Sequence, residues 1–262
     1  MPEKNMKLAI QAEIEQFVAS YQDRHRTRTG CGAPLVGFAS ATDPRFAELK
    51  SLISPTHKVP TDLLDQAESV VAFFLPLPKT VSTSNREGPL ASEDWAVAYI
   101  EINQLISDVG LHVKTFLETH GFVAHYVPAT HYFDQEKLIS DWSHRHVARI
   151  AGLGSFGLNN MLITSQGCCG RIGSLVTTAR LEPDPVNPQP ACLYRYDRSC
   201  SQCVQRCVRG ALQTDRFDRR RCFEVCLENY ERFKPLGNAG VCGKCVVGLP
   251  CTHVNPVEVK NR

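Results

Sequence analysis

The stretches Cys200-Ser-Gln-Cys203-Val-Gln-Arg-Cys207 and Cys242-Gly-Lys-Cys245-Val-Val-Gly-Leu-Pro-Cys251 stand in the last quarter of this chain. Each begins with a C-x-x-C pair, and two thiolates at this spacing reach one iron centre from a single tight turn. A third thiolate a few residues further on, such as Cys207, belongs in two-cluster ferredoxins to the neighbouring cluster. Two [4Fe–4S] clusters need about eight thiolates. The region holds nine of the twelve cysteines: Cys192, Cys200, Cys203, Cys207, Cys222, Cys226, Cys242, Cys245 and Cys251. The spacing therefore predicts a small ferredoxin-like domain that relays single electrons.

Three other uses of the cysteines fit the sequence less well. A disulfide framework needs an oxidising compartment, and the N-terminal residues 1–5 lack the basic-then-apolar pattern of a secretory signal. A zinc-stabilised binding module could use the two C-x-x-C pairs as a four-thiolate site, but five nearby cysteines would then have no role. Scattered core cysteines would not form two such pairs. Iron–sulfur chemistry uses the whole set.

Length and charge narrow the class of protein. The chain has 262 residues, 43% of them hydrophobic, which is enough for a large domain and a smaller one. Its formal net charge of +2 gives no overall attraction to nucleic acid. The longest apolar stretch, Val70–Leu77, is far shorter than the ~20 residues of a membrane span. We therefore expect a protein of the reducing cytoplasm that does not associate with membranes.

The expected fold class is α+β, with a layered sheet domain over residues 1–185 and the small ferredoxin-like double-cluster domain over residues 186–262. The proline-rich stretch 182–190 marks the linker. Apolar spacing predicts the elements of the larger domain. Helices are expected over 10–21, 92–119 and about 136–150, and strands over 35–38, 69–75 and 122–127, with a hairpin-like pair at 162–164 and 172–178.

A second motif runs from Ser143 to Asn160 and carries glycines at 152, 154 and 157, directly after an expected helix end. Glycines let the backbone approach a ligand closely, and free backbone amides can bind an anionic group. A dinucleotide-binding Gly-x-Gly-x-x-Gly follows a strand and opens a helix, whereas this one follows a helix. A dinucleotide site is therefore disfavoured.

This motif resembles the core motif of the epoxyqueuosine reductases and their shorter relatives. The resemblance rests on Ser143-His-Arg145, Ala151-Gly-Leu-Gly154, Gly157, Asn159 and Leu162-Ile163, on Gly170-Arg171 and Leu175-Val-Thr-Thr178, and on the cysteine order as far as Cys251. Such proteins, like the reductive dehalogenases related to them, pair a cobalamin-binding α+β domain with two [4Fe–4S] clusters that pass electrons to the cobalt. The resemblance implies an iron–sulfur oxidoreductase in which cobalamin reduces a substrate.

The resemblance also implies how the cysteines are shared, because the last cysteine of each motif crosses to the other cluster. One cluster would be bound by Cys207, Cys222, Cys242 and Cys245, and the other by Cys200, Cys203 and Cys251. The usual fourth ligand of the latter falls at Asp197, three residues before Cys200. Cys192 is the expected replacement and Cys226 its rival, while Cys31, Cys168 and Cys169 lie outside the set.

For the corrinoid, the resemblance implies a site near the glycine turn, formed by Arg145, Gly152, Gly154, Gly157 and Asn159. Arginine suits the acidic phosphate or amide-rich periphery of such a cofactor because its guanidinium is always charged.

The family's acidic proton donor falls at Leu138 in this chain. Asp141 is the candidate in its place, because on a continuous helix it would lie one turn before Arg145, on the same face.

Other departures from the family leave the substrate open. Ser155 and Leu158 replace the usual tryptophan and lysine, and we expect the protein to lack the helical-repeat extension that helps hold tRNA. We therefore expect a small-molecule or corrinoid substrate rather than tRNA, with a low-potential electron donor such as ferredoxin or flavodoxin. The alternative is an electron-transfer protein without bound cobalamin, which delivers electrons to a partner corrinoid protein.

Overall fold

A four-stranded antiparallel sheet in the order β1-β2-β8-β3 lies at the centre of the computed structural model, which describes residues 3–129 and 132–261. Strand β2 (Ser69–Pro76) pairs along its whole length with β8 (Gly170–Thr177), with Leu75 opposite Arg171. The outer strands are β1 (Leu35–Ser40), beside β2, and β3 (Ala124–Val127), beside β8. Every residue of β2 is buried, because helices cover both faces of the sheet.

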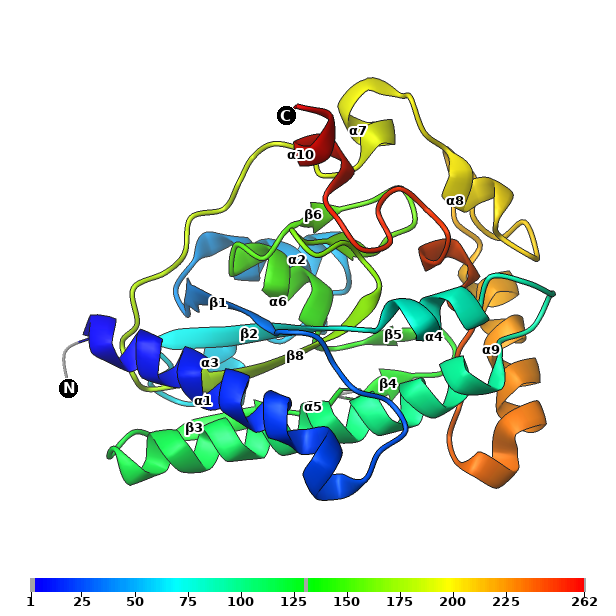
Figure 1. Cartoon of the computed structure of the whole chain (residues 1–262). Helices are drawn as coiled ribbons and strands as arrows, with labels where there is room; N and C mark the ends of the chain where they lie inside the picture. Colours follow the sequence, from blue (N-terminus) through cyan, green and yellow to red (C-terminus); the bar gives the residue numbers. More distant parts are fainter. Residues whose placement is uncertain (1–2, 130–131, 262) are drawn as a thin grey trace.

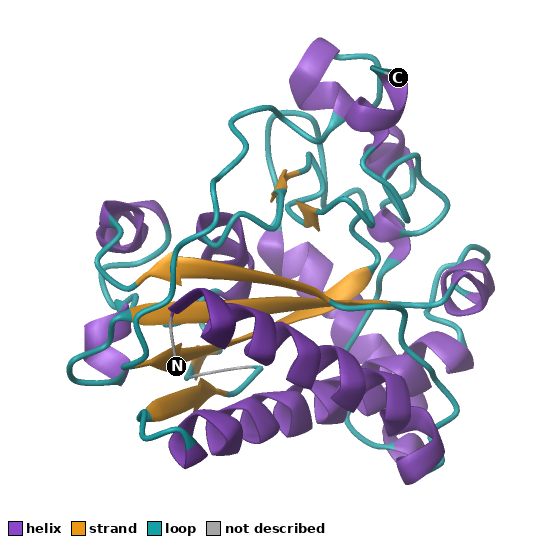
Figure 2. Cartoon of the chain, turned by 60° about the vertical axis from the view of Figure 1, so that its left-hand side comes forward, coloured by secondary structure: helices purple, strands orange, loops and turns teal. Residues whose placement is uncertain are grey.

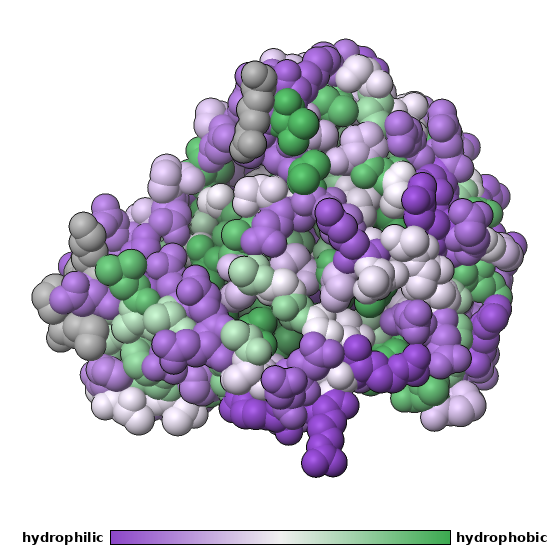
Figure 3. All heavy atoms as spheres, viewed as in Figure 1, coloured by the Kyte–Doolittle hydropathy of each residue, from purple (hydrophilic) through white to green (hydrophobic). Residues whose placement is uncertain are grey.

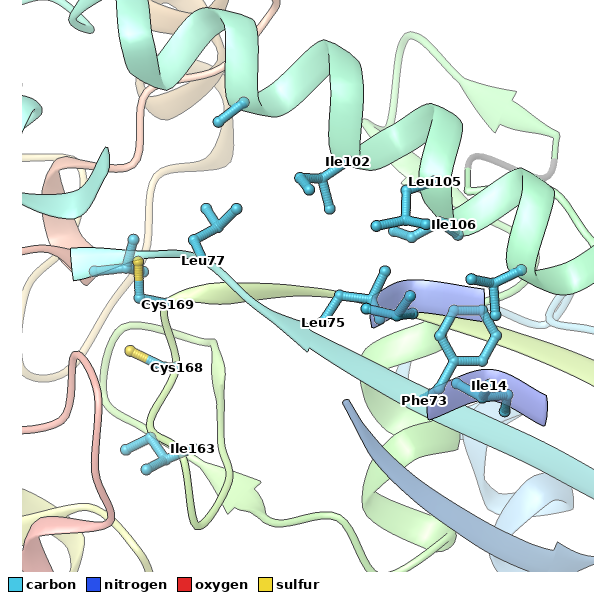
Figure 4. Close-up of a cluster of buried hydrophobic side chains, with 14 of the residues drawn as sticks. Ile14, Phe73, Leu75, Leu77, Ile102, Leu105, Ile106, Ile163, Cys168 and Cys169 are labelled. Atoms are coloured by element: carbon cyan, nitrogen blue, oxygen red, sulfur yellow. The ribbon is translucent and has the colours of Figure 1, made fainter. Parts of the chain in front are cut away.

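The helices form a layer on each side of the sheet (Figures 1 and 2). Helices α1 (Glu3–His25) and α5 (Glu93–Thr119) pack together on one face, and α2 (Pro44–Leu52) and α6 (His144–Ile150) lie on the other. Alternate side chains of β2 serve the two layers, as strand geometry requires. Phe73 and Leu75 join the core under α5, where Figure 4 shows them facing Ile102 and Ile106, whereas Val70 and Ala72 join the core under α6.

The remaining helices and strands follow in chain order. They are α3 (Pro60–Leu63), α4 (Lys79–Ser84), β4 (Phe133–Asp134), β5 (Ile139–Ser140), β6 (Ser155–Phe156), β7 (Leu162–Ile163), α7 (Leu193–Asp197), α8 (Gln202–Gln205), α9 (Arg219–Phe233), η1 (Lys234–Leu236), η2 (Lys244–Val246) and α10 (Pro256–Lys260).

The cysteine-rich last quarter packs against the end of this layered sheet (Figure 1). The core under α5 continues into Leu212, Phe233, Val246 and Leu249. The predicted boundary after residue 185 falls in an extended segment between β8 and α7 that contains no helix or strand. Both predicted domains therefore contribute side chains to one buried core.

The α+β fold class is confirmed, and so are the predicted helices at 10–21 and 92–119, which the structure shows as α1 and α5. The Ser92 hydroxyl accepts a hydrogen bond of 3.2 Å from the Trp95 backbone N–H and caps α5. Beyond its other end, Gly121 has a φ of +82°. Local sequence signals are sufficient for α5, because its apolar stripe and the signals at its two ends all indicate the same helix.

The helix expected over about 136–150 is wrong in its first half, where the structure has the β4–β5 hairpin. The Asp134 carboxylate accepts hydrogen bonds of 2.9 Å from the backbone N–H groups of Glu136 and Lys137, and Leu138 has a φ of +54°. Such a side-chain turn competes directly with a helix. Arg219 and Arg220 of α9 also donate to the carbonyls of Lys137 and Glu136, so the hairpin is held from outside.

The hairpin-like pair predicted at 162–164 and 172–178 is also wrong. Strand β7 pairs with β6, and β8 enters the central sheet. The segment between β7 and β8 pairs with another part of the chain: the backbone N–H groups of Cys168 and Cys169 donate to the carbonyls of Cys251 and Thr252. The intervening turn is thus occupied by the cysteine-rich segment.

The surface seen in Figure 3 intersperses apolar with polar side chains. Within the described ranges, none of the helices combines the length and the apolar composition needed to cross a lipid bilayer.

The packing of α5 on β3 yields a stability prediction at Gly110. A Cβ atom at this position would lie 2.1 Å from the Tyr126 ring. We expect Gly110→Ala to lower the free energy of unfolding by about 1–3 kcal/mol through overpacking, although alanine is the better helix former. Thermal unfolding under anaerobic conditions measures this. Tyr126→Leu should reduce the cost of Gly110→Ala, and equal costs in both backgrounds would contradict the packing explanation.

Candidate functional site

The cysteines of the last quarter line two adjoining pockets. The smaller pocket has a volume of about 20 Å³ and is lined by four cysteines: Cys192, Cys200, Cys203 and Cys251. Cys192 precedes α7, Cys200 and Cys203 flank the start of α8, and Cys251 follows η2. The structure therefore brings Cys192 to the three cysteines with which the sequence predicted it to act, although seven residues separate it from Cys200.

The larger pocket has a volume of about 220 Å³ and is lined by six cysteines: Cys168, Cys207, Cys222, Cys226, Cys242 and Cys245. Cys222 and Cys226 are four residues apart on α9, so both thiols lie on one face of the helix. Cys242 and Cys245 stand on either side of Gly243, the left-handed residue that starts η2, with a φ of +73°. Four of these six are the predicted ligands of one cluster, and Cys226 and Cys168 are additional.

The sheet domain supplies the rest of the larger pocket's wall. Trp95 and Tyr99 reach it from α5, Arg171 from β8, and Leu77 from the end of β2. A Cβ atom on Gly243 would lie 2.2 Å from the Trp95 ring, so only glycine lets the Cys242–Cys245 turn rest on that ring.

Lys244 anchors the same turn from within. Its side chain is 1% exposed, and its ammonium donates hydrogen bonds of 2.9 and 2.7 Å to the carbonyls of Asn85 and Glu87. The Asn85 amide in turn donates to the Cys242 carbonyl at 2.9 Å. The loop between α4 and α5 is thereby fastened to the cysteine-rich segment, which keeps the turn over Trp95.

Asn159 and Cys168 stand between the two pockets. Asn159 is 4% exposed and lines the smaller pocket, while its amide donates to the Cys245 carbonyl at 2.9 Å and to the Cys168 sulfur at 3.7 Å. The Cys168 and Cys251 sulfurs are 3.9 Å apart. Asn159, predicted from the sequence to lie beside a corrinoid, thus lies in the wall that separates the cysteine groups.

Burial changes the acidity of the thiols. Desolvation, strengthened by the neighbouring cysteines, raises the pKa of Cys222 to about 11 and the pKa values of Cys203 and Cys226 to about 12. The protein alone therefore disfavours thiolates in these pockets. Bound cations would reverse this preference, because metal binding to cysteine displaces the thiol proton.

The larger pocket has enough thiols to hold a multinuclear iron–sulfur group, whereas the smaller pocket has the thiols but too little space as it stands. Within residues 3–129 and 132–261, no three Cys, His, Asp or Glu side chains converge on a position for one metal ion. In the larger pocket the thiols instead surround a space, as a group bound at its corners requires. The smaller pocket has four thiols in a volume near that of one water molecule, so its walls would have to widen to admit such a group.

The predicted corrinoid glycines have a different explanation in the structure. A Cβ atom would lie 2.8 Å from the Pro185 carbonyl oxygen at Gly152, 2.2 Å from the Ile163 carbonyl oxygen at Gly154, and 2.5 Å from the Asn159 side-chain oxygen at Gly157. The chain itself fills the space that each glycine leaves. Close packing therefore accounts for all three glycines.

Arg145 has the most accessible side chain of the predicted corrinoid residues. It is exposed on α6, and its guanidinium donates a hydrogen bond of 2.5 Å to the Asn160 carbonyl. Desolvation by the surrounding protein, followed by repulsion from Arg219, lowers the pKa of Arg145, while the nearby Cys245 and Cys222 act in the opposite direction. A ligand on Arg145 would therefore lie close to the larger pocket.

Asp141 does not occupy the helical position from which its role was predicted. Helix α6 begins at His144, after Ser143, so Asp141 lies outside it and not one turn before Arg145. The Asp141 residue is 9% exposed, and its backbone carbonyl accepts a hydrogen bond of 2.7 Å from Lys58. The role of Asp141 as a proton donor stays a prediction, but the helical position on which that prediction was based is not present.

Three residues of the larger pocket escaped the sequence analysis. The sequence places Trp95 only within the helix expected over 92–119, Arg171 only within a family motif, and Lys244 only as the spacer of a C-x-x-C pair. For Lys244 the sequence does offer a signal, namely a lysine placed between the two cysteines of a C-x-x-C pair. The positions of Trp95 and Arg171 depend on long-range packing, which residue spacing does not reveal.

Comparison with known proteins supports the fold at low sequence identity. Neither the protein-family models nor the curated proteins contain a match to this chain. A solved structure of epoxyqueuosine reductase from Streptococcus thermophilus matches with a TM-score of 0.57 and 18% identity, over 91% of this chain and 66% of that one. A selenomethionine-labelled epoxyqueuosine reductase matches with a TM-score of 0.54 and 19% identity, over 92% and 66%.

A catabolic reductive dehalogenase, solved with 3-bromo-4-hydroxybenzoic acid, matches with a TM-score of 0.52 and 13% identity, over 87% of this chain and 31% of that one. This chain thus spans about two thirds of the length of the epoxyqueuosine reductases and about one third of the dehalogenase. The expected fold is confirmed: the chain has the fold of the epoxyqueuosine reductases, shared more distantly with a reductive dehalogenase.

Proposed function

We propose that this protein is an iron–sulfur oxidoreductase that passes single electrons through two [4Fe–4S] clusters. The observation that carries the proposal is the gathering of the last nine cysteines, with Cys168, around two adjoining pockets. When bound, such clusters accept and donate one electron at a time, at a potential set by their surroundings. The fold shared with the epoxyqueuosine reductases supports the same class of chemistry.

Each pocket offers a four-thiolate ligand set. In the smaller pocket the set is Cys192, Cys200, Cys203 and Cys251, and in the larger pocket it is Cys207, Cys222, Cys242 and Cys245. The wall of Asn159 and Cys168 would place the two groups next to each other, which favours electron transfer between them.

A bound corrinoid in the larger domain is the finer part of the proposal. Its support is the shared fold and the exposed Arg145 beside the larger pocket, because this guanidinium could hold an acidic or amide-bearing periphery. The substrate reduced there would be a small molecule or another corrinoid, and it is not defined by the fold.

A second candidate is an electron-transfer protein without its own corrinoid. Close packing explains the three glycines, and Asn159 belongs to the wall between the pockets, so four of the five predicted corrinoid residues have internal roles. This observation favours delivery of electrons to a partner corrinoid protein.

The electron donor would be an acidic low-potential carrier such as ferredoxin or flavodoxin. Residues 195–221 contain eight arginines and only three aspartates, with no glutamate. Of these arginines, Arg209 lines the larger pocket next to the exposed Val208, where it is ion-paired with Glu228. A basic surface at the pocket would attract an acidic partner, and this attraction would weaken with salt.

Iron and acid-labile sulfide should each approach about eight per chain in protein purified without oxygen. Cys245→Ala should reduce both to about four, because it removes a ligand of one cluster. Cys31→Ala is the matched control, since Cys31 lines neither pocket and its thiol donates to the Pro76 carbonyl. Chemical analysis tests this, and wild-type contents near four would eliminate the second cluster.

Two further variants test whether Cys192 or Cys226 is the eighth cysteine ligand of the two proposed clusters. Cys192→Ser should leave a three-iron or labile cluster, visible by electron paramagnetic resonance, because Cys192 lines the smaller pocket. Cys226→Ser should leave both clusters intact, because the larger pocket has four other predicted ligands. The reverse pattern would transfer the ligand role to Cys226.

Titration with cob(II)alamin distinguishes the two candidate functions. Binding should give the spectral change of base-off cobalamin, and Arg145→Ala should weaken it at least about tenfold, as expected for a lost charge-assisted hydrogen bond. Arg149→Ala, at the exposed position one turn further along α6, is the control. No binding at tens of micromolar, with iron content intact, would favour the electron-transfer protein.

A further inference from the structure

Two buried N–H groups in the wall of the larger pocket have no acceptor. Among the described residues, Trp95 Nε1 and Arg171 Nε are buried without any hydrogen-bond partner. Both residues line the larger pocket. Leaving a buried donor unsatisfied costs about 1–3 kcal/mol, so two such groups on residues that line the same cysteine-lined pocket indicate a ligand that accepts hydrogen bonds.

The Trp95 ring has little freedom to turn away. It is 6% exposed, and its residue lies in the first turn of α5, where the backbone N–H is bound to Ser92. A Cβ atom on Gly243 would lie 2.5 Å from Trp95 Nε1 itself. The indole N–H therefore lies directly against the turn between Cys242 and Cys245.

Arg171 brings a positive charge to the same wall. Its guanidinium stacks on the Tyr99 ring at 4.3 Å, and Tyr99 lies one turn after Trp95 on α5. Desolvation lowers the pKa of Arg171, and Tyr99 is its stabilising partner. In the part of the chain that the structure describes, Arg171 forms no ion pair with a carboxylate, so its charge calls for an anion in the pocket.

The smaller pocket differs in this respect. Apart from its cysteines and Asn159, its lining is apolar: Leu158, Ile163, Leu193, Leu249, Pro250 and Pro256. The larger pocket is lined by Arg171, by Arg209, which is ion-paired with Glu228, and by Lys244, whose ammonium donates to two carbonyls. Added electrons make an iron–sulfur group more negative, so nearby cations and N–H donors stabilise its reduced form.

We propose that Trp95 Nε1 and the Arg171 guanidinium donate hydrogen bonds to sulfur atoms of the cluster in the larger pocket and raise its reduction potential above that of the other cluster. The inference rests on the proposed function. The cluster in the smaller pocket takes one electron from a low-potential one-electron reductant and passes it to the oxidised cluster in the larger pocket, without any bond being made or broken. The larger pocket is thus the acceptor side of the pair, next to Arg145.

Reductive titration of the anaerobic protein, followed by electron paramagnetic resonance, tests this with Trp95→Phe and Arg171→Met. Trp95→Phe removes the N–H while keeping a ring against Gly243. We expect the higher of the two midpoint potentials to fall, with about a tenfold change in the reduction equilibrium, or about 59 mV for one electron. The lower potential and the iron content should stay as in the wild type.

Trp142→Phe is the matched control, because Trp142 is the second of the two tryptophans and its indole donates to Ser174 at 3.0 Å, away from the pockets. If Trp95→Phe fails to incorporate iron, Arg171→Lys, which keeps the charge and removes the guanidinium, tests the second of the two proposed hydrogen bonds. Unchanged potentials in loaded Trp95→Phe and Arg171→Met would overturn the inference and leave the two-cluster function standing. Wild-type protein without iron would overturn both.

Discussion

The close contact between Trp95 and Gly243 is the constraint on which the arrangement of this molecule depends. It joins the first turn of the longest helix to the turn between two cysteines that are almost 150 residues away in the sequence. Because no other side chain fits at Gly243, the contact fixes the depth at which the Cys242–Cys245 turn lies against the sheet domain. Lys244 and Asn85 then hold the turn in place from the other side.

The electrostatic character of the pockets follows from this arrangement. One pocket combines thiols with cations and unsatisfied N–H groups, and the other combines thiols with aliphatic side chains. Among the described residues the Arg171 guanidinium has no ion pair with a carboxylate, and a protein without a ligand gains nothing from this, since the desolvation of a charge is costly. In the proposed two-cluster protein, these different environments would give the clusters different potentials and so order electron transfer, because potentials respond to charge and hydrogen bonds.

Sequence patterns predicted those features that are encoded locally. Apolar spacing and terminal signals located α1 and α5, and C-x-x-C spacing together with the family resemblance grouped the cysteines in the two sets that line the pockets. The hairpin at Asp134 was missed because a side-chain turn and two distant arginines override a helical pattern. Trp95 and Arg171 could not be assigned to the pocket, because their neighbours there are defined by tertiary packing.

The shared wall of the larger pocket also affects the order in which the parts of the chain can fold. Helix α5 and strand β8 leave the ribosome before any of the nine cysteines that follow β8, so the N-terminal layers can form first. Until the last quarter of the chain arrives, Trp95, Tyr99 and Leu77 have no cover at the end of the sheet. Folding would therefore end with a closing step, in which the cysteine-rich segment completes a core that synthesis has left open.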